Sequence, residues 1–500
     1  MDSRISELCN LLPAKRYRDG MAAGFQDASV REGFKRYVQN LEFSDADYTT
    51  GWKHDAFDLV LCHIPMPPRS GLLEDVFLSL RKRGTCVFIA PARISSEYLE
   101  KRLLAQAAGN TSTVKTYGLA PSLDEIRLMA PLMNNACATA SLALYQPSLK
   151  TAKARKLVAY TLSRLGLAGI WTPYRIVVMD NGRDESKQGL RRLAEEHFGR
   201  AVEFALFTGT PGYLRKVTVQ IMDTSGNILG YCKIGNSLQT KDVLQNEAAM
   251  LKLLSGLSLG RSMIPSLLFA GESHAGDFFL IQSARKGPLS SAPLTPGDIH
   301  VDFLTRLAEQ TGREMEFLQS SCYREVAKRF TSVRAYADTD HYRRLGHVLT
   351  WLEKALSGKK MMLCVAHRDF TPWNTYISGG RLNVFDWEFS RRDWAPMTDA
   401  FHFIIQKGIL VDRCLPDALW ERLFSASSRD GRFIRQCAAA TVVEKSDIPA
   451  LFAFYLCDIV TMYLSHNGQE RCVPPDGKIL RETWMGLLGM VLSRSMADVS

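Results

Sequence analysis

The first 150 residues alternate short apolar runs with amphipathic segments. FDLVLCHI at 57–64 and TCVFIAP at 85–91 are uninterrupted apolar runs of the kind found in buried parallel strands. Between them lies a helical pattern, LLEDVFLSLRKRG, which we expect to end at Gly84. ATASLALYQP at 138–147 is a further strand candidate. This order of strands and helices predicts an α/β, Rossmann-like half-sheet over residues 1–150.

The middle of the chain changes to the pattern of an antiparallel sheet. A basic segment, SLKTAKARK, marks a soft boundary, and we interpret residues 151–199 as a connecting segment. The runs AVEFALFTG, RKVTVQIMD and ILGYCKIG alternate with turns rich in Gly, Pro and Asn, which predicts three consecutive antiparallel strands. We therefore expect a strand-rich region at 200–286 and a mainly helical region at 287–500.

Size, composition and charge place the chain among ordinary folded proteins. Its 500 residues exceed what one hydrophobic core usually supports, so several domains are expected. Hydrophobic residues make up 46% and charged residues 23%, which excludes a disordered or fibrous chain. The net charge of +10 is spread over 62 basic and 52 acidic residues. Because no Lys/Arg-rich block is interleaved with aromatic residues, we expect no nucleic-acid partner.

Cysteine usage and hydropathy indicate a cytoplasmic protein. None of the eleven cysteines falls in a C-x-x-C pair, and most lie inside apolar runs, which is typical of reduced core thiols and not of zinc ligands. The N-terminus lacks the apolar core of a signal peptide. The late stretch ALFAFYLCDIVTMYL contains Asp458 and is shorter than a bilayer span, so we expect a buried helix and no membrane insertion.

The candidate chemistry begins in HRDFTPWN. His367, Asp369 and Asn374 form the pattern H-x-D-x-x-x-x-N directly after the apolar run MMLCVA, and the run LNVF then leads to Asp386 in FDWE. Phosphoryl transfer needs an oriented acceptor hydroxyl, and it needs magnesium held on carboxylate and amide oxygens. A loop with Asp and Asn, followed by a strand that ends in a second Asp, supplies those groups. The first pattern alone arises by chance, but FDWE at this distance strengthens it.

A carboxylate in the middle of an apolar helix face is the next signal. In TKDVLQNEAAMLKLLSG, Glu247 shares one helical face with five apolar residues, Val243, Leu244, Met250, Leu251 and Leu254. An unpaired charge buried there would cost several kcal/mol, so Glu247 needs a cation. Lys233, in the preceding strand GYCKIG, is the predicted partner, because kinase folds hold a phosphate-binding lysine in this way. The alternative is that Glu247 reaches solvent at the helix edge.

The hairpin before the lysine strand offers a weaker signal for phosphate binding. TGTPGY contains Gly209 and Gly212, and glycine lets backbone N–H groups approach phosphate closely. The same pattern is also that of a plain hairpin turn.

These motifs resemble the aminoglycoside phosphotransferase/choline kinase-like family. HRDFTPWN, VFDWEFS and PMTDAFHF carry the resemblance in the helical region, and FTGTPGYLRKVTVQ, ILGYCKIG and NEAAMLKLL carry it before that, over about residues 200–465 in all. The resemblance implies a bilobal α+β protein-kinase-like fold, with the N-lobe at 200–286, the C-lobe at 287–500 and ATP between the lobes. Two departures stand out: Arg368 replaces the small residue common in the family, and the glycine loop is short.

The resemblance also assigns roles to individual residues. It makes Asp369 the catalytic base, gives magnesium to Asn374 and Asp386, and places Lys233 on the ATP phosphates. The supporting residues are His367, which braces the catalytic loop, Asp399, which anchors it, and Glu388, which could face a cationic substrate. His402, in the apolar FHF, is expected to be a core histidine, and Trp373 and Trp387 are expected to wall the pocket or pack in the core.

The expected function is that of a phosphotransferase dependent on ATP and Mg²⁺. It would move the γ-phosphoryl group to a hydroxyl of a small molecule: an aminoglycoside, an amino alcohol, a sugar or a biosynthetic intermediate. The alternative is a nucleotide-binding pseudokinase with a regulatory or scaffolding role. A protein kinase is disfavoured because DFG, APE and G-x-G-x-x-G-x-V are all missing. A homodimer is left open.

The N-terminal half-sheet resembles a truncated class I methyltransferase. No G-x-G occurs in the chain, and Gly20, Gly24, Gly33 and Gly51 follow no clear apolar strand. The cofactor-binding end of such a fold is therefore expected to be missing. We expect no S-adenosylmethionine or dinucleotide binding by residues 1–150, and a role in packing, dimerisation or substrate presentation instead.

Overall fold

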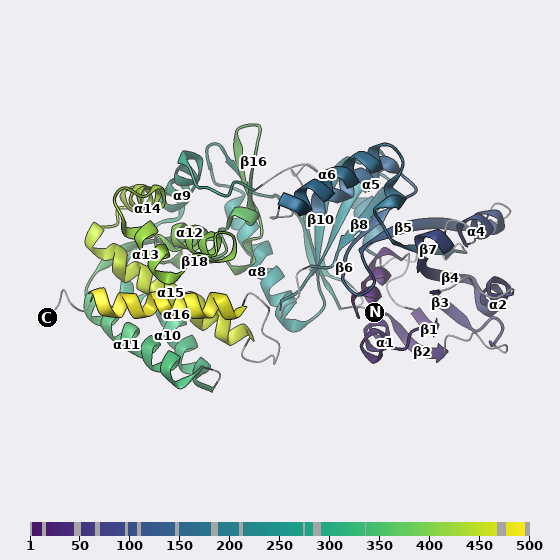
Figure 1. Ribbon diagram of the computed structural model, residues 1–500, viewed down its shortest axis with the longest axis horizontal. Helices are drawn as coiled ribbons and strands as arrows, with labels where there is room; N and C mark the ends of the chain where they lie inside the picture. Colours follow the sequence, from purple (N-terminus) through teal and green to yellow (C-terminus); the bar gives the residue numbers. More distant parts are fainter. Residues whose placement is uncertain are drawn as a thin grey trace. The chain divides into compact units, whose positions relative to one another are not determined.

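The computed structural model describes residues 3–12, 17–44, 52–65, 71–95, 99–107, 112–145, 150–181, 189–209, 214–273, 276–283, 292–335, 337–467 and 477–495. The chain forms two compact units (Figure 1). Unit 1 contains Met1–Thr210, Arg215–Lys241 and Leu267–Leu289. Unit 2 contains Pro211–Leu214, Asp242–Ser266 and Ser290–Ser500.

The N-terminal part of unit 1 is a parallel half-sheet. Its strands β1 (Tyr17–Ala23), β2 (Val38–Ser44), β3 (Phe57–His63) and β4 (Leu80–Pro91) are parallel and lie in the order β2-β1-β3-β4. Helices α1 (Ala28–Lys35), α2 (Leu72–Ser79) and α4 (Glu100–Ala107) belong to the same region. Both apolar runs predicted as strands, at 57–64 and 85–91, are confirmed, and so is the Rossmann-like half-sheet.

Three local expectations in this region are wrong. Residues 138–147 form no strand: α5 (Asn135–Ser141) and η3 (Leu142–Leu144) occupy most of that run, because Asn134 caps the helix and the Ala-rich sequence favours it. Helix α2 ends at Ser79, and Gly84 lies inside β4. The expectation that no glycine of this region follows a clear strand is also wrong. β1 is a complete strand, and Gly24 follows it directly with a φ of +80°.

The rest of unit 1 extends the same sheet with antiparallel strands. Four of them, in spatial order from β4, are β7 (Tyr174–Asp180), β5 (Thr113–Pro121), β6 (Ile126–Pro131) and β8 (Val202–Phe207). The segment 151–199 thus contributes a strand, β7, to the interior of the sheet. It also contains α7 (Leu190–Phe198) and most of α6 (Lys150–Arg164), which lies next to α5.

The predicted meander of three strands is confirmed. β8 pairs with β9 (Val217–Asp223), and β9 pairs with β10 (Ile228–Gly235), in both cases antiparallel. β13 (Phe278–Ser283) and β12 (Leu267–Glu272) complete the twelve-stranded sheet that the described residues form. One apolar core runs along a face of this sheet from Leu59 and Val87 to Val219 and Ile281.

Unit 2 is mainly helical, with two small sheets. One sheet has the order β11 (Ser262–Met263), β17 (Arg381–Val384), β16 (Thr375–Ser378), and the other β14 (Arg313–Glu316), β15 (Lys360–Ala366), β18 (Arg391–Trp394). The helices of its described residues are most of α8 (Leu238–Leu254), α9 (Asp298–Thr311), α10 (Ser321–Ser332), α11 (Thr339–Ala355), α12 (Thr398–Leu410), α13 (Pro416–Phe424), α14 (Arg429–Ala440), α15 (Ile448–Asn467) and α16 (Gly477–Ser495). The predicted architecture, a Rossmann-like half-sheet with an α+β part that is mainly helical in its last 200 residues, is confirmed.

Helix α15 is the core helix of unit 2, in contact with α10, α11, α12 and α16. Among the described residues, it is the one helix whose length and composition would suffice to cross a membrane, and 78% of the apolar window is buried. The expected buried helix is confirmed, although the stretch is longer than expected.

The cysteines of the described residues are all free thiols. Nine of these ten are buried and Cys414 is partly exposed, while Cys472 lies outside the described residues. The cytoplasmic location stays a prediction.

Candidate active site

Asp399 fixes the backbone of the catalytic-loop candidate HRDFTPWN, residues 367–374. It lies in the first turn of α12, and its Oδ2 and Oδ1 accept hydrogen bonds from the backbone N–H groups of His367 and Arg368, both at 2.8 Å. Burial raises the pKa of Asp399 above its ordinary value. The His367 ring and the hydrogen bonds from the two backbone N–H groups lower that pKa, but by less than burial raises it. The predicted anchor therefore contacts the loop through its main chain.

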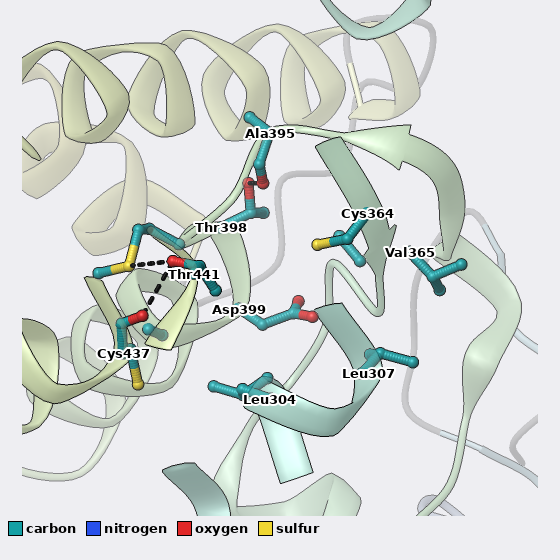
Figure 2. A pocket seen from close by; sticks show the side chains of 12 residues that line it. Leu304, Leu307, Cys364, Val365, Ala395, Thr398, Asp399, Cys437 and Thr441 are labelled. Atoms are coloured by element: carbon teal, nitrogen blue, oxygen red, sulfur yellow. Dashed lines mark hydrogen bonds between the residues drawn. The ribbon is translucent and has the colours of Figure 1, made fainter. Parts of the chain in front are cut away.

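A small apolar pocket surrounds this carboxylate. Figure 2 shows Asp399 among Leu304, Leu307, Cys364 and Thr398. The pocket volume is about 30 Å³, which is room for about two water molecules and far below what a nucleotide needs. The side chains that line the pocket account for the burial of Asp399. Burial also raises the pKa of the Cys364 thiol to about 12, and the nearby Asp399 acts in the same direction. The pocket is part of the support for the loop and not a substrate site.

His367 braces the loop against the strand that leads to Asp386. Its Nδ1 accepts from the backbone N–H of Asp369 at 3.2 Å, and its Nε2 lies 3.0 Å from the carbonyl oxygen of Phe385. This pattern places the ring proton on Nε2, which donates to that carbonyl. Trp387 packs against the ring, with centroids 4.6 Å apart, and is fully buried, so it is a core residue.

Asp369 and Asn374 face each other across the loop. The 3-10 turn η7 (Pro372–Asn374) brings the Asn374 amide nitrogen to 2.8 Å from Asp369 Oδ2 and 2.9 Å from the Asp369 carbonyl oxygen. The Asp369 side chain is 29% exposed, whereas Asn374 is buried. The structure therefore presents one oriented carboxylate that a ligand can reach.

His402 is a further contact of Asp369, and sequence reasoning missed it. Its Nε2 lies 3.2 Å from Asp369 Oδ1, and the Tyr455 hydroxyl lies 3.2 Å from its Nδ1. A neutral imidazole satisfies both contacts when Tyr455 donates to Nδ1 and Nε2–H donates to Asp369. The histidine is buried, as expected, but it is not an ordinary core residue. Its spacing of three from Asp399 on α12 was the available signal, since both then lie on one helix face.

Three carboxylates gather at the end of β17. Glu247 on α8 (Leu238–Leu254), Asp386 and Glu388 bring ligand oxygens within 4.8 Å of one another. Asp386 has a φ of +73° as the chain turns into η8 (Trp387–Phe389). Like charges this close repel each other, so the group favours a cation, and oxygen ligands suit Mg²⁺. The alternative in which Glu247 reaches solvent is wrong, because the residue is fully buried.

Asn246 holds this arrangement together. Its amide nitrogen donates to the carbonyl oxygens of Glu388 at 2.9 Å and Ser390 at 3.0 Å, which joins α8 to the turn after Asp386. The sequence predicted Glu247, Asp386 and Glu388 as site residues but not their grouping.

Arg368, the departure from the family pattern, forms a buried ion pair with Asp458 of α15. Its Nη2 lies 2.6 Å from Asp458 Oδ1 and its Nε 3.2 Å from Oδ2, and its guanidinium stacks 4.1 Å from the Trp394 ring centroid. Arg329 also contacts Asp458. Burial alone would raise the pKa of Asp458, but Arg368 and Arg329 hold it below its usual value.

Two of the remaining predicted residues, Lys233 and Gly209, lie in unit 1. Lys233 is buried on β10, opposite Thr218 of β9 and Leu280 of β13. Gly209 follows β8 with a φ of +75°, and a Cβ there would lie 2.4 Å from the carbonyl oxygen of Lys216, so only glycine fits. Gly212 lies outside the described residues. The pairing of Lys233 with Glu247 stays a prediction.

Comparison with known proteins shows similarity to phosphotransferases. Residues 228–426 match the sequence model of a phosphotransferase enzyme family. No curated protein matches the chain. Similar solved structures include a choline kinase, LicA, from Streptococcus pneumoniae, at 16% identity over 55% of this chain and 89% of that one, with a TM-score of 0.39. Another is an APH(4)-Ia aminoglycoside phosphotransferase with ADP and hygromycin B, at 12% identity over 60% and 98%, with a TM-score of 0.41. The family match confirms the predicted resemblance and the enzyme class.

Removing the buried ion pair of Arg368 with Asp458 should have a large effect on stability. Asp458→Asn should lower the free energy of unfolding of unit 2 by about 3–5 kcal/mol at neutral pH, because two arginines lose their buried counter-charge. Urea unfolding followed by tryptophan fluorescence measures this well, since six of the eight tryptophans belong to unit 2. The folded-state pKa of Asp458 is lowered, so its contribution is present above the unfolded pKa and fades on acidification. The difference in the free energy of unfolding between wild type and Asp458→Asn should therefore become smaller at low pH.

The matched control is Asp340→Asn, which removes a carboxylate from exposed pairs with Arg343 and Arg344 on α11. It should leave the unfolding curve unchanged. Equal stability of Asp458→Asn and wild type at neutral pH would contradict the account.

Proposed function

From the match of residues 228–426 to the phosphotransferase enzyme family, we propose that this chain is a kinase dependent on ATP and Mg²⁺ that phosphorylates a hydroxyl of a small molecule. The observation that carries the proposal is the catalytic loop of unit 2. There a buried scaffold presents Asp369 beside Asn374, and an oxygen-rich group lies at the end of β17. Phosphoryl transfer depends on these two features.

The residues that would hold Mg²⁺ are Asp386 and Asn374. Asn374 turns its amide nitrogen to Asp369, which leaves the amide oxygen for a cation. Glu247 and Glu388 bring further carboxylate oxygens close to Asp386, and this donor set fits a hard divalent cation. When bound, Mg²⁺ neutralises the negative charge of the phosphates. We place Glu388 with this group and not with a cationic acceptor, because it is buried beside Asp386 and Glu247.

Asp369 acts on the acceptor. Its Oδ2 is oriented by Asn374 and its Oδ1 by His402, so the carboxylate is fixed from both sides while remaining partly exposed. The acceptor hydroxyl donates to this carboxylate, which aligns its oxygen for attack on the γ-phosphorus. A new bond forms between the hydroxyl oxygen and phosphorus as the bond to the β,γ-bridging oxygen breaks. The hydroxyl proton passes to Asp369, and ADP leaves.

Substitution of the proposed base tests the function. Asp369→Asn should keep MgATP affinity and lower the turnover of an accepted substrate by about 10²–10⁴-fold, the usual contribution of a general base. ADP release is measured across a panel of aminoglycosides, amino alcohols and sugars. Asp417→Asn, on the exposed start of α13, is the matched control and should turn over like wild type. Unchanged turnover by Asp369→Asn would remove this residue from the mechanism. MgATP binding by wild type with no acceptor phosphorylated would favour the pseudokinase.

The contact from His402 predicts a separable effect on turnover. His402→Leu removes the donor to Asp369 Oδ1, so kcat should fall by about 10–100-fold because the base loses its fixed orientation, while KM for ATP stays unchanged. His402→Gln keeps an amide donor and should recover much of the rate. Steady-state kinetics of both variants, with Tyr455→Phe as an intermediate case, measure this. Equal losses in the Leu and Gln variants would show that His402 acts only through packing.

A further inference from the structure

Helix α6 and the turn after it carry a group of exposed large apolar side chains on unit 1. Five large apolar side chains there are between 45% and 68% exposed: Leu157, Val158, Leu165, Leu167 and Ile170. We call these five residues the α6 face. Single exposed apolar side chains are ordinary on a protein surface, but a contiguous group of them marks an interaction site.

The helix itself is firmly anchored by its opposite side. Ala159 packs in a small apolar cluster with Leu128 and Leu142, next to the partly buried Tyr160. Lys156 is also buried and donates to the carbonyl oxygen of Tyr145 at 2.7 Å, and burial lowers its pKa to about 8. Figure 1 shows α6 beside α5 along the sheet. The exposed face is therefore the outer side of a docked helix.

Helical spacing turns the exposed residues into a strip with charged borders. Leu157 and Val158 lie on one side of α6, together with Thr161. Leu165, directly after the helix, continues that side, because its backbone N–H still donates to the carbonyl oxygen of Thr161. Exposed basic residues border the strip on both flanks, with Lys153 and Arg164 on one and Arg155 on the other. Residues 126–179 contain no Asp or Glu at all, so no acidic residue of this segment offsets the cations.

A helix with an apolar strip between two basic borders fits one kind of partner best. At a lipid bilayer such a helix lies in the interface plane, with the apolar strip in the acyl boundary and the cations at the phosphate level. A second copy of the chain is a poorer partner, because two α6 faces would bring their positive borders together. We propose that the α6 face docks unit 1 on membrane surfaces rich in anionic phospholipid. This docking is independent of the phosphotransferase activity.

Co-sedimentation of the full chain with vesicles tests the proposal. The protein should pellet with vesicles of phosphatidylcholine mixed with phosphatidylserine, pellet poorly with phosphatidylcholine alone, and be released by salt. Leu157→Ser with Leu165→Ser should weaken binding to the mixed vesicles by at least about tenfold, because two leucines no longer enter the bilayer. The control variant is Leu415→Ser, which should bind the vesicles like wild type. Leu415 is 74% exposed at the start of α13, away from the α6 face in the sequence.

The basic borders are tested separately. Arg155→Glu with Arg164→Glu should abolish the preference for phosphatidylserine, whereas Lys328→Glu with Arg334→Glu, at exposed positions of unit 2, should retain it. Thermal melting of every variant checks the fold. No pelleting with the mixed vesicles, or pelleting that survives both sets of α6 changes, would overturn the proposal. So would a concentration-dependent dimer that the Leu157 and Leu165 changes abolish, which would assign the α6 face to self-association.

Discussion

Two hydrogen bonds from the Asp399 carboxylate to consecutive backbone N–H groups are the constraint on which the site depends. The carboxylate is buried in a small pocket lined largely by apolar side chains, so the two buried amides depend on it as their acceptor. The His367 ring and the Arg368–Asp458 ion pair then fix the two side chains of the same backbone segment. The loop is thereby held by β17 on one side and by helices α12 and α15 on the other. Asp369 is presented from this rigid base.

The site also separates two electrostatic tasks within unit 2. Donors surround Asp369, with Asn374 on one carboxylate oxygen and His402 on the other. Acceptors surround the position beside Asp386, where Glu247 and Glu388 add two further carboxylates. A carboxylate that receives donors stays oriented for a hydroxyl proton, whereas three acceptors in close range favour a cation. Asn374, in the same 3-10 turn, donates its amide nitrogen to Asp369, and in the proposed function its amide oxygen would serve the cation.

The features that sequence could predict are those encoded over short distances. The strands of the meander and the H-x-D-x-x-x-x-N loop follow from local periodicity and spacing, and Glu247 from its place on an apolar helix face. The run at 138–147 was misassigned because an Ala- and Leu-rich segment has no period that separates a buried strand from a helix. β1 was missed because YRDGMAA carries Arg18 and Asp19 inside the strand. The contact of Asp386 with Glu247 joins distant segments, and no local pattern encodes it. For His402, the spacing from Asp399 indicates a shared helix face but not the contact with Asp369.

The central claim is that this oxygen-rich group binds the metal that accompanies ATP. Calorimetric titration of ATP into the full chain, with and without Mg²⁺, tests it most directly in wild type and Asp386→Ala. The account predicts that wild type binds ATP at least about tenfold more tightly with Mg²⁺, and that Asp386→Ala loses this gain while Asp417→Ala keeps it. Equal MgATP affinity in wild type and Asp386→Ala would contradict the account.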